Sequence, residues 1–332
     1  MERNNRLFMV IPCYNEQEVL PETSKRLLEK INNLVSRDII SADSRIVFVN
    51  DGSKDNTWEI IESLHAENPV FQGLKLSKNR GHQNALLSGL MTVKDVCDVT
   101  ISMDADLQDD IDAIEEMLQK YMDGANIVFG VRSKRETDTF FKRYTAESYY
   151  KLMSKLGADT VYNHADFRLM DSTALSMLAD FGEVNLFLRG IVPMIGLETD
   201  IVYYERAERL AGESKYPLFK MIQFALEGIT SLSTKPIRMI TELGVFIFFV
   251  SIIVLIYSLV RYFTGHTITG WTTTVLSVWA IGGLTMISLG VIGEYIGKIY
   301  LETKNRPRYI IGKYLGDEED KDKVSLRDVK FK

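Results

Sequence analysis

The chain has 332 residues, of which 46% are hydrophobic and 25% are charged, and its formal net charge is −6. A chain of this length can bury a large core without cross-links, which excludes the small disulfide-stabilised scaffolds. The acidic balance argues against an extended nucleic-acid-binding surface, because such surfaces are basic.

The first third of the chain alternates short apolar strands with amphipathic helices. The predicted strands are Leu7 to Ile11, Arg45 to Asn50, Gly73 to Leu76, Val99 to Met103 and Ile127 to Gly130, and the predicted helices are Val19 to Ser36, Thr57 to Glu67, His82 to Met91 and Ile111 to Asp123. This alternation is typical of repeated βαβ units around a mostly parallel sheet. We therefore predict a doubly wound α/β domain.

Polar clusters follow four of these strands. They are Asn15-Glu16, Asp51-Gly52-Ser53-Lys54-Asp55, Asn79-Arg80-Gly81 and Asp104-Ala105-Asp106. In open α/β sheets, ligands bind outside the carboxyl ends of the strands. The four clusters are therefore predicted to form one site.

The chain between about 140 and 233 has a less regular pattern. We predict a helix at Ala146 to Leu156, a strand at Phe167 to Met170 and a helix at Ala174 to Phe181. From Tyr216 to Ser233 the apolar residues fall mostly along one helical face, which favours a helix lying on a membrane surface. The alternative is a helix that packs on the soluble domain.

Two long uncharged stretches follow. The 18 residues between Glu242 and Arg261 and the 32 residues between Arg261 and Glu294 carry no charge, and about 20 residues suffice to cross a bilayer. We predict two transmembrane helices, about 243–260 and 268–293, joined as a hairpin. Basic residues are concentrated outside this pair, so the positive-inside rule places both termini in the cytoplasm.

The chain is thus predicted to have four parts. They are a cytoplasmic α/β domain (1–215), an interfacial amphipathic helix region (216–240), two transmembrane helices (241–296), and a cytoplasmic basic segment with a charged tail (297–332). Pro12 interrupts the apolar run near the N-terminus, so we expect no export signal there. The predicted location is the cell membrane, with two spans and the large domain on the cytoplasmic face.

Two carboxylates, Asp104 and Asp106, directly follow the apolar strand Val99 to Met103. Carboxylates with this spacing can share a hard divalent cation such as Mg²⁺ or Mn²⁺, which completes its shell with waters and phosphate oxygens. Taken singly, an Asp-x-Asp sequence is also common in surface loops, and Asp51-Gly52-Ser53 is a common turn. The order of the clusters along the chain favours the site.

Several motifs recur in a fixed order. The first are Pro12-x-Tyr14-Asn15-Glu16, Asn50-Asp51-Gly52-Ser53-x-Asp55, Asn79-Arg80-Gly81-His82-Gln83 and Asp104-Ala105-Asp106-Leu107-Gln108. This series resembles the family 2 glycosyltransferases, which have the GT-A fold. The later motifs are Ala165-Asp166-Phe167-Arg168-Leu169-Met170, Phe187-Leu188-Arg189-Gly190 and Arg209-x-x-Gly212-x-Ser214-Lys215-Tyr216-Pro217. With the two spans, they resemble the polyprenyl-phosphate glycosyltransferases, relatives of dolichyl-phosphate mannose synthase. The resemblance covers about Leu7 to Arg308.

The resemblance implies inverting transfer of one sugar from a nucleotide diphosphate to the phosphate of a membrane polyprenol. The favoured donor is a UDP-sugar carrying glucose or N-acetylglucosamine, and the alternative is GDP-mannose. Undecaprenyl phosphate is the expected acceptor, and cell-envelope glycan modification is the expected purpose. The expected partners are the donor, the lipid and the membrane, without nucleic acid, and self-association is left open.

The resemblance also implies roles for single residues. Mg²⁺ or Mn²⁺ would be held by Asp104, Asp106 and Gln108; the nucleotide would be bound by Pro12, Tyr14, Glu16, Asp51, Asp55, Arg80 and Asp104; and the catalytic residues would be Asp106 and Asp166. The acceptor phosphate has a second pKa near ~6, so cations that position it matter more than a strong base. The candidate cations are Arg132, Arg168, Arg206, Arg209 and Lys215, and the alternative is that they only neutralise anionic lipid.

Asp166 is the candidate residue closest to the reaction. In the predicted strand, alternation sends Asp166 and Arg168 to one face and the ring of Phe167 to the core. Asp166 could then orient the acceptor phosphate or take the residual proton from its monoanionic form.

Two rival functions predict other sequence features. A processive polysaccharide synthase would carry a Gln-x-x-Arg-Trp motif and more spans, and no tryptophan of this chain follows an arginine. A non-catalytic scaffold that binds sugar nucleotides would be expected to lose the metal carboxylates, and Asp104 and Asp106 are intact.

Overall fold

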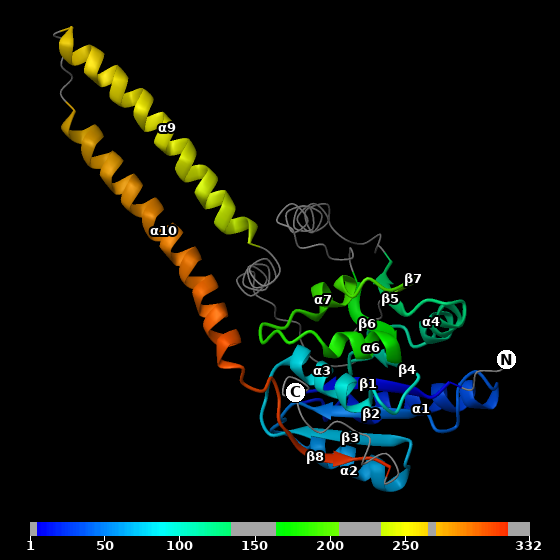
Figure 1. The fold of residues 1–332 in the computed structure, drawn as a ribbon. Coiled ribbons are helices and arrows are strands. Elements are labelled where there is room, and N and C mark those ends of the chain that lie inside the picture. Colours follow the sequence, from blue (N-terminus) through cyan, green and yellow to red (C-terminus); the bar gives the residue numbers. More distant parts are fainter. Residues whose placement is uncertain (1–4, 134–163, 206–233, 265–269, 318–332) are drawn as a thin grey trace. The chain divides into compact units, whose positions relative to one another are not determined.

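Figure 1 shows the computed structural model, which describes residues 5–133, 164–205, 234–264 and 270–317. The chain divides into two compact units. The first comprises Met1–Tyr150, Asp159–Pro217 and Asn305–Lys332, and the second comprises Lys151–Ala158 and Leu218–Lys304. The first unit is built around a mixed sheet, and the second contains two long helices.

The described residues of the first unit form an eight-stranded sheet. Its strands are β1 (Leu7–Cys13), β2 (Arg45–Asn50), β3 (Phe71–Leu76), β4 (Val99–Ser102), β5 (Ile127–Arg132), β6 (His164–Asp171), β7 (Thr199–Tyr204) and β8 (Ile311–Leu315), in the order β7-β5-β6-β4-β1-β2-β3-β8. β6 runs antiparallel between β4 and β5, and β8 runs antiparallel to β3, while the other neighbours are parallel. The carboxyl ends of the parallel strands therefore share one edge of the sheet.

Helices cover both faces of the sheet. They are α1 (Leu20–Ser36), α2 (Thr57–Glu67), α3 (His82–Val93), α4 (Ala113–Met122), α6 (Ser172–Ala179) and α7 (Leu188–Met194). Residues of α1, α2 and α4 pack in one core, and residues of α3, α6 and α7 pack in the other. Side chains alternate along β1, so that Leu7, Met9 and Ile11 join the first core and Phe8 and Val10 join the second. The predicted α/β class is confirmed.

Helix α3 approaches the sheet closely at Gly89. A Cβ atom at this position would lie 2.4 Å from Cγ1 of Val10 and 2.7 Å from Cγ2 of Val49. Only a residue without a side chain fits this crossing. The crossing fixes α3, which begins with His82 just beyond the carboxyl end of β3.

Most predicted elements are present. The strands and helices predicted before residue 132 match the structure to within a few residues at their ends, and the strand predicted at Phe167 to Met170 is the longer β6. The helix predicted at Ala174 to Phe181 is α6. Three described elements, α7, β7 and β8, were not predicted. The predicted helices at Ala146 to Leu156 and Tyr216 to Ser233 lie outside the described residues.

The strand β8 follows both long helices in the chain, yet it completes the sheet edge beside β3. Directly before it, the carbonyl of Ile310 accepts a hydrogen bond from the backbone N–H of Ser77 at 2.9 Å. Ser77 immediately precedes the loop that carries the polar cluster Asn79-Arg80-Gly81. The segment after the second long helix is therefore part of the sheet domain.

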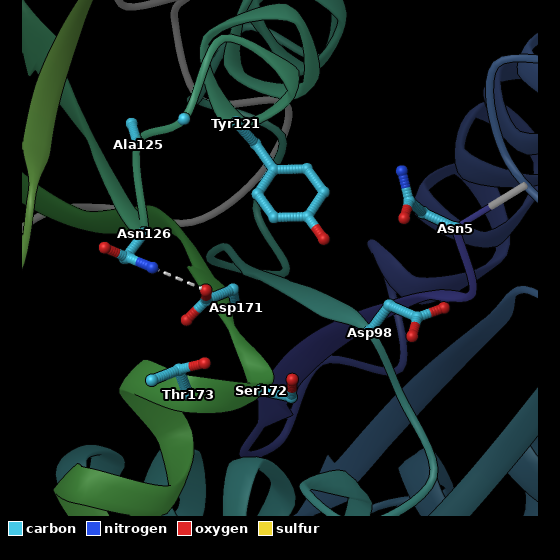
Figure 2. A pocket seen from close by; sticks show the side chains of 9 residues that line it. Asn5, Asp98, Tyr121, Ala125, Asn126, Asp171, Ser172 and Thr173 are labelled. Atoms are coloured by element: carbon cyan, nitrogen blue, oxygen red, sulfur yellow. Dashed lines mark hydrogen bonds between the residues drawn. The ribbon is translucent and has the colours of Figure 1, made fainter. Parts of the chain in front are cut away.

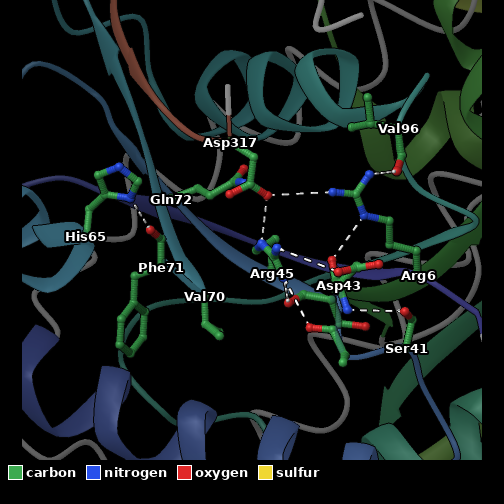
Figure 3. Close-up of polar contacts among 12 residues, drawn as sticks. Arg6, Ser41, Asp43, Arg45, His65, Val70, Phe71, Gln72, Val96 and Asp317 are labelled. Atoms are coloured by element: carbon green, nitrogen blue, oxygen red, sulfur yellow. Dashed lines mark hydrogen bonds and ion pairs between the residues drawn. The ribbon is translucent and has the colours of Figure 1, made fainter. Parts of the chain in front are cut away.

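Asp317 connects the end of this segment to the sheet domain through polar contacts, which Figure 3 shows. Its carboxylate accepts a hydrogen bond from Nε of Arg45 at 2.9 Å and from Nε2 of Gln72 at 3.3 Å, and it lies 3.7 Å from Nη2 of Arg6. The side chains of Asp317 and Arg45 are only 22% and 14% exposed, so solvent screens their interaction incompletely.

Asp317→Ala is expected to lower the free energy of unfolding of the sheet domain by about 1–2 kcal/mol, because it removes a partly buried charge-assisted hydrogen bond. Chemical denaturation of the purified chain in detergent measures this loss. Asp43→Ala is the matched control, since that carboxylate is 72% exposed and lies 4.0 Å from the same Arg45. Equal losses for the two variants would show that the contacts of Asp317 do not specifically stabilise the sheet domain.

The second unit contains α9 (Lys235–Phe263) and α10 (Trp271–Lys304). Both are long and apolar enough to cross a membrane: the stretch Lys235–Val254 has a mean hydropathy of 2.2, and Ser277–Lys304 has 1.4. Neither apolar stretch is buried inside the structure. By length and composition, the two helices are compatible with membrane association.

Candidate active site

Hydrogen bonds join the loops that follow β1 and β2. The backbone N–H of Asn15 donates to Oγ of Ser53 at 3.0 Å, and Oδ1 of Asn15 accepts from the backbone N–H of Lys54 at 2.9 Å. Oδ2 of Asp55 accepts from the backbone N–H of Gln17 at 3.2 Å. The first two polar clusters therefore form one structural unit at the carboxyl edge of the sheet.

Asp51 ties the third cluster to the second. Its two oxygens accept the backbone N–H groups of Arg80 at 2.6 Å and Gly81 at 2.9 Å, and the residue is only 3% exposed. Gly52 has a φ of 66°, and a Cβ atom there would lie 2.5 Å from the backbone nitrogen of Asn79. Burial raises the pKa of Asp51, although the two N–H groups oppose that rise. Asp51 therefore shapes the loop that would surround a nucleotide.

The other predicted nucleotide contacts differ in exposure. Pro12 is buried within β1, while the ring of Tyr14 is 43% exposed at the strand end. Glu16 is half-buried, and its backbone N–H donates to Oγ1 of Thr57 at 2.9 Å. Nε of Arg80 is buried and has no hydrogen-bond partner among the described residues. The ring of Tyr14 is thus accessible at the strand end, and Arg80 retains a donor without a partner among the described residues.

The predicted metal ligands lie in the loop after β4. Oδ1 of Asp106 accepts the backbone N–H of Gln108 at 3.2 Å, and Oγ1 of Thr23 donates to the carbonyl of Ala105 at 2.7 Å. The side chain of Asp104 is 35% exposed. Among the described residues, no three Asp, Glu, His or Cys side chains are already grouped as metal ligands. A cation held by Asp104 and Asp106 would therefore need phosphate oxygens or waters to complete its shell.

Asp166 is a nearly buried carboxylate surrounded by cations. Arg168 donates to it at 2.5 Å, Arg189 donates through Nη2 at 2.9 Å, and Nε2 of His82 lies 3.3 Å away. Burial opposes ionisation, but the hydrogen bond from His82 and the two guanidinium charges outweigh it and hold the pKa of Asp166 well below its usual range. The ring of Phe167 is fully buried in the core, in agreement with the predicted alternation.

The two arginines around Asp166 have different environments. Arg168 is 1% exposed, whereas 45% of the Arg189 side chain is exposed. Arg168, which was predicted as an acceptor contact, pairs with Asp166 inside the fold. Arg189 offers an accessible positive charge, although it was not predicted as a site residue.

His82 connects Asp166 to the metal loop. Its Nε2 lies 3.6 Å from Oδ1 of Asp104 and 3.3 Å from Oδ2 of Asp166. Burial lowers the pKa of His82, but the two neighbouring carboxylates more than reverse this effect, so that the pKa is raised. The fourth polar cluster is thus joined to the others, and the predicted single site agrees with this geometry.

Arg132 ends β5 at the same edge of the sheet. Its Nε donates to the hydroxyl of Tyr204 at 3.2 Å, and its Nη2 lies 3.5 Å from Oδ1 of Asp109. Neither Tyr204 nor Asp109 was predicted as a site residue. The other predicted acceptor cations, Arg206, Arg209 and Lys215, lie outside the described residues.

A polar hollow of about 480 Å³ lies at the opposite edge of the sheet (Figure 2). Asp171, which lines it, accepts hydrogen bonds from Nδ2 of Asn126 at 2.8 Å and from the backbone N–H of Ala174 at 2.7 Å, where it caps α6. Asp98, also in the lining, accepts the backbone N–H of Arg6 at 2.8 Å. Because these carboxylates already stabilise the fold, the candidate active site remains at the carboxyl edge.

The chain is similar to known proteins over most of its length. A family model described as Glycosyl transferase family 2 matches residues 8–180. The chain is 51% identical to a Bacillus subtilis protein named uncharacterized glycosyltransferase YkoT, over 94% of this chain and 93% of the relative. It is 39% identical to the SfII prophage-derived bactoprenol glucosyl transferase of Shigella flexneri, over 93% of this chain and 98% of the relative.

One solved structure with partial similarity is glucosyl-3-phosphoglycerate synthase from Mycobacterium tuberculosis in complex with Mn²⁺, uridine diphosphate and phosphoglyceric acid. It is 14% identical, covers 70% of this chain and 78% of its own, and has a TM-score of 0.46.

Proposed function

The chain belongs to glycosyl transferase family 2, and we propose that it moves one sugar from a nucleotide diphosphate to the phosphate of a membrane polyprenol, with inversion at the anomeric carbon. The observation that carries the proposal is that His82 lies between Asp104, a predicted metal ligand, and Asp166, a carboxylate that contacts two arginines. Relatives named bactoprenol glucosyl transferase, 39% identical over nearly their whole length, support the lipid acceptor and favour glucose as the sugar. The alternative donors are UDP-N-acetylglucosamine and GDP-mannose.

The donor would bind at the loops after β1, β2 and β4. Asp104 and Asp106, with Gln108 beside them, would hold Mg²⁺ or Mn²⁺, which supplies positive charge to the diphosphate as it leaves. Oxygen ligands at a strand end suit such a hard cation. Tyr14 would stack on the base, and the loop shaped by Asp51 would enclose the nucleoside.

The acceptor phosphate would approach from the side of Asp166. One of its oxygens attacks the anomeric carbon, the bond from that carbon to the diphosphate breaks, and the nucleoside diphosphate departs with the bonding electrons. The lowered pKa makes Asp166 a weak base, so its proposed task is to orient Arg189 and His82 toward the reacting phosphates. Arg189 would contact the acceptor, with Arg132 and Lys215 as further cations.

The experiment that tests the function is a transfer assay. The purified chain in detergent is incubated with radiolabelled UDP-glucose, UDP-N-acetylglucosamine or GDP-mannose, each with undecaprenyl phosphate and Mg²⁺ or Mn²⁺. Label from one donor is expected to enter the lipid phase, and to remain in the aqueous phase when the polyprenyl phosphate is omitted. Binding of all donors without transfer of any label would support the scaffold alternative.

We further propose that α9 and α10 form a membrane hairpin whose ends, with the sheet domain, lie in the cytoplasm. Basic residues flank the pair, whereas Arg261 is the one basic residue near the turn between them. In sealed cells, a cysteine at Thr267 is expected to react with an impermeant maleimide, while one at Lys321 reacts only after permeabilisation. The unmodified chain is the control, because Cys13 and Cys97 are both buried. Labelling of both positions from the same side would rule out the hairpin.

A further inference from the structure

Asp109 is a buried carboxylate next to the candidate active site, and the proposed reaction assigns it no role. It lies five positions after Asp104 in the loop that follows β4, and it is 3% exposed. Its Oδ1 accepts the hydroxyl of Tyr204 at 2.6 Å and lies 3.5 Å from Nη2 of Arg132. Its Oδ2 is buried and has no hydrogen-bond partner among the described residues. A carboxylate in such surroundings is costly unless a cation offsets it.

Tyr204 is the second member of this group. Its hydroxyl donates to Asp109 and accepts from Nε of Arg132 at 3.2 Å, so it bridges the two charged residues. The ring is 3% exposed and packs edge-on against Phe167, with the ring centres 5.2 Å apart. Phe167 lies between Asp166 and Arg168 in β6. The contact between the two rings therefore positions the Tyr204 hydroxyl relative to the strand that carries these two residues.

Arg132 is the member that faces solvent. It ends β5, and a quarter of its side chain is exposed. A long arginine side chain loses considerable conformational entropy when it binds an anion, and partners that hold it beforehand reduce that loss. Asp109 and Tyr204 hold two different nitrogens of the guanidinium group, which fixes its plane as well as its position.

We propose that Asp109 and Tyr204 are positioning residues that preorganise Arg132 for the acceptor phosphate. They also connect Arg132 to the loop after β4 that carries Asp104. This rests on the proposed function for the identity of the acceptor. The three residues come from the loop after β4 and from the ends of β5 and β7, so the group links the Asp104 loop to the ends of these two strands. The metal carboxylates and the acceptor cation then keep a fixed separation.

The test uses Tyr204→Phe, which removes the bridging hydroxyl and keeps the ring that packs on Phe167. The KM for polyprenyl phosphate is expected to rise about five- to tenfold, which corresponds to the net contribution of about one ordinary hydrogen bond. The KM for the nucleotide sugar and kcat are expected to stay within about twofold of wild type, an allowance smaller than the contribution of a single hydrogen bond. Tyr309→Phe is the matched control, since Tyr309 is 1% exposed in the core on the other face of the sheet.

A double-mutant cycle separates positioning from a general structural effect. In an Arg132→Ala background, Tyr204→Phe is expected to cause no further rise in the acceptor KM, because the residue that it positions is gone. The same holds for Asp109→Asn. A rise of equal size in both backgrounds, or a parallel rise in the KM for the donor, would overturn the proposal.

The cycle also distinguishes this proposal from the proposed function. If the chain transfers sugar to a different phosphate-bearing acceptor, the same coupling between Tyr204 and Arg132 is expected with that acceptor, and the polyprenyl assignment alone is lost. If transfer to polyprenyl phosphate occurs without that coupling, the positioning role alone is lost.

Discussion

Asp106→Asn is expected to reduce sugar transfer by a factor on the order of 10² to 10³, the range seen when one group that stabilises transition-state charge is removed. Asparagine keeps the side-chain shape and an Oδ1 that can still accept the backbone N–H of Gln108, as Asp106 does at 3.2 Å. What is lost is the negative charge that would hold the divalent cation against the diphosphate. Asp104→Asn is expected to be similarly severe.

Two measurements separate cation binding from a change in the fold. Titration with Mn²⁺, followed by its paramagnetic resonance signal in the presence of UDP, should show weaker binding by the Asp106→Asn protein. The thermal midpoint should stay close to that of the wild type. Asp110→Asn is the matched control, because it makes the same charge change at an exposed residue of the same loop. Wild-type turnover and unchanged metal dependence in Asp106→Asn would show that this carboxylate is no ligand.

The parallel part of the fold could be predicted because its signal is local. Each strand from β1 to β5 is a short apolar run with a helix-forming segment after it, and this alternation fixes both the class and the edge where ligands bind. β8 lacks such a signal. It is short, follows a long helix, and gains its stability from pairing with β3, where Lys75 faces Lys313 from a distant part of the chain.

Part of the candidate active site could also be predicted from the sequence. Asp104 and Asp106 lie together in the sequence, so their spacing, together with the order of the other polar clusters along the chain, predicts a cation site. His82 and Arg189 could not be found in this way, since their contacts with Asp166 arise only when α3 and α7 are placed beside β6. Burial was equally hidden: Arg168 was predicted as an acceptor contact because of its charge, whereas its 1% exposure and its pairing with Asp166 arise only from the fold.

Asp166→Asn is the second variant for which we expect a large effect, and it should act on both turnover and stability. The neutral amide no longer balances Arg168, which is 1% exposed, and leaving such a charge unpaired costs about 3–5 kcal/mol. Turnover is expected to fall by a factor on the order of 10², because Arg189 and His82 lose the anion that orients them. Nucleotide affinity, measured by calorimetry on the folded fraction, should change little.

Arg168→Met is the matched variant that tells the two effects apart. It removes the other half of the same buried pair, and a smaller loss of stability is expected because Asp166 keeps Arg189 and His82 as partners. Its turnover should therefore fall much less than that of Asp166→Asn. If both variants lose turnover in proportion to stability, Asp166 is a structural residue and its role in orienting the phosphates is wrong.

The pH dependence of the Asp166→Asn defect decides between orientation and proton transfer. The pKa of Asp166 in the folded protein lies well below its usual value, so its stabilising effect is fully present above about pH 4 and is lost only as the pH falls through that lowered pKa. Between pH 5 and pH 8 its charge is therefore constant. Because Asp166 also raises the pKa of His82, its loss lowers that pKa, and we expect the ratio of wild-type to variant turnover to stay level or to narrow toward pH 5, where His82 is protonated in both proteins. If Asp166 instead took the residual proton of the acceptor, the ratio would grow below about pH 6, where the phosphate becomes monoanionic. Turnover measured with saturating donor and lipid across this range, with Arg168→Met as the stability control, separates the two roles, because a lost orienting charge does not enlarge the defect at low pH, whereas lost proton transfer does.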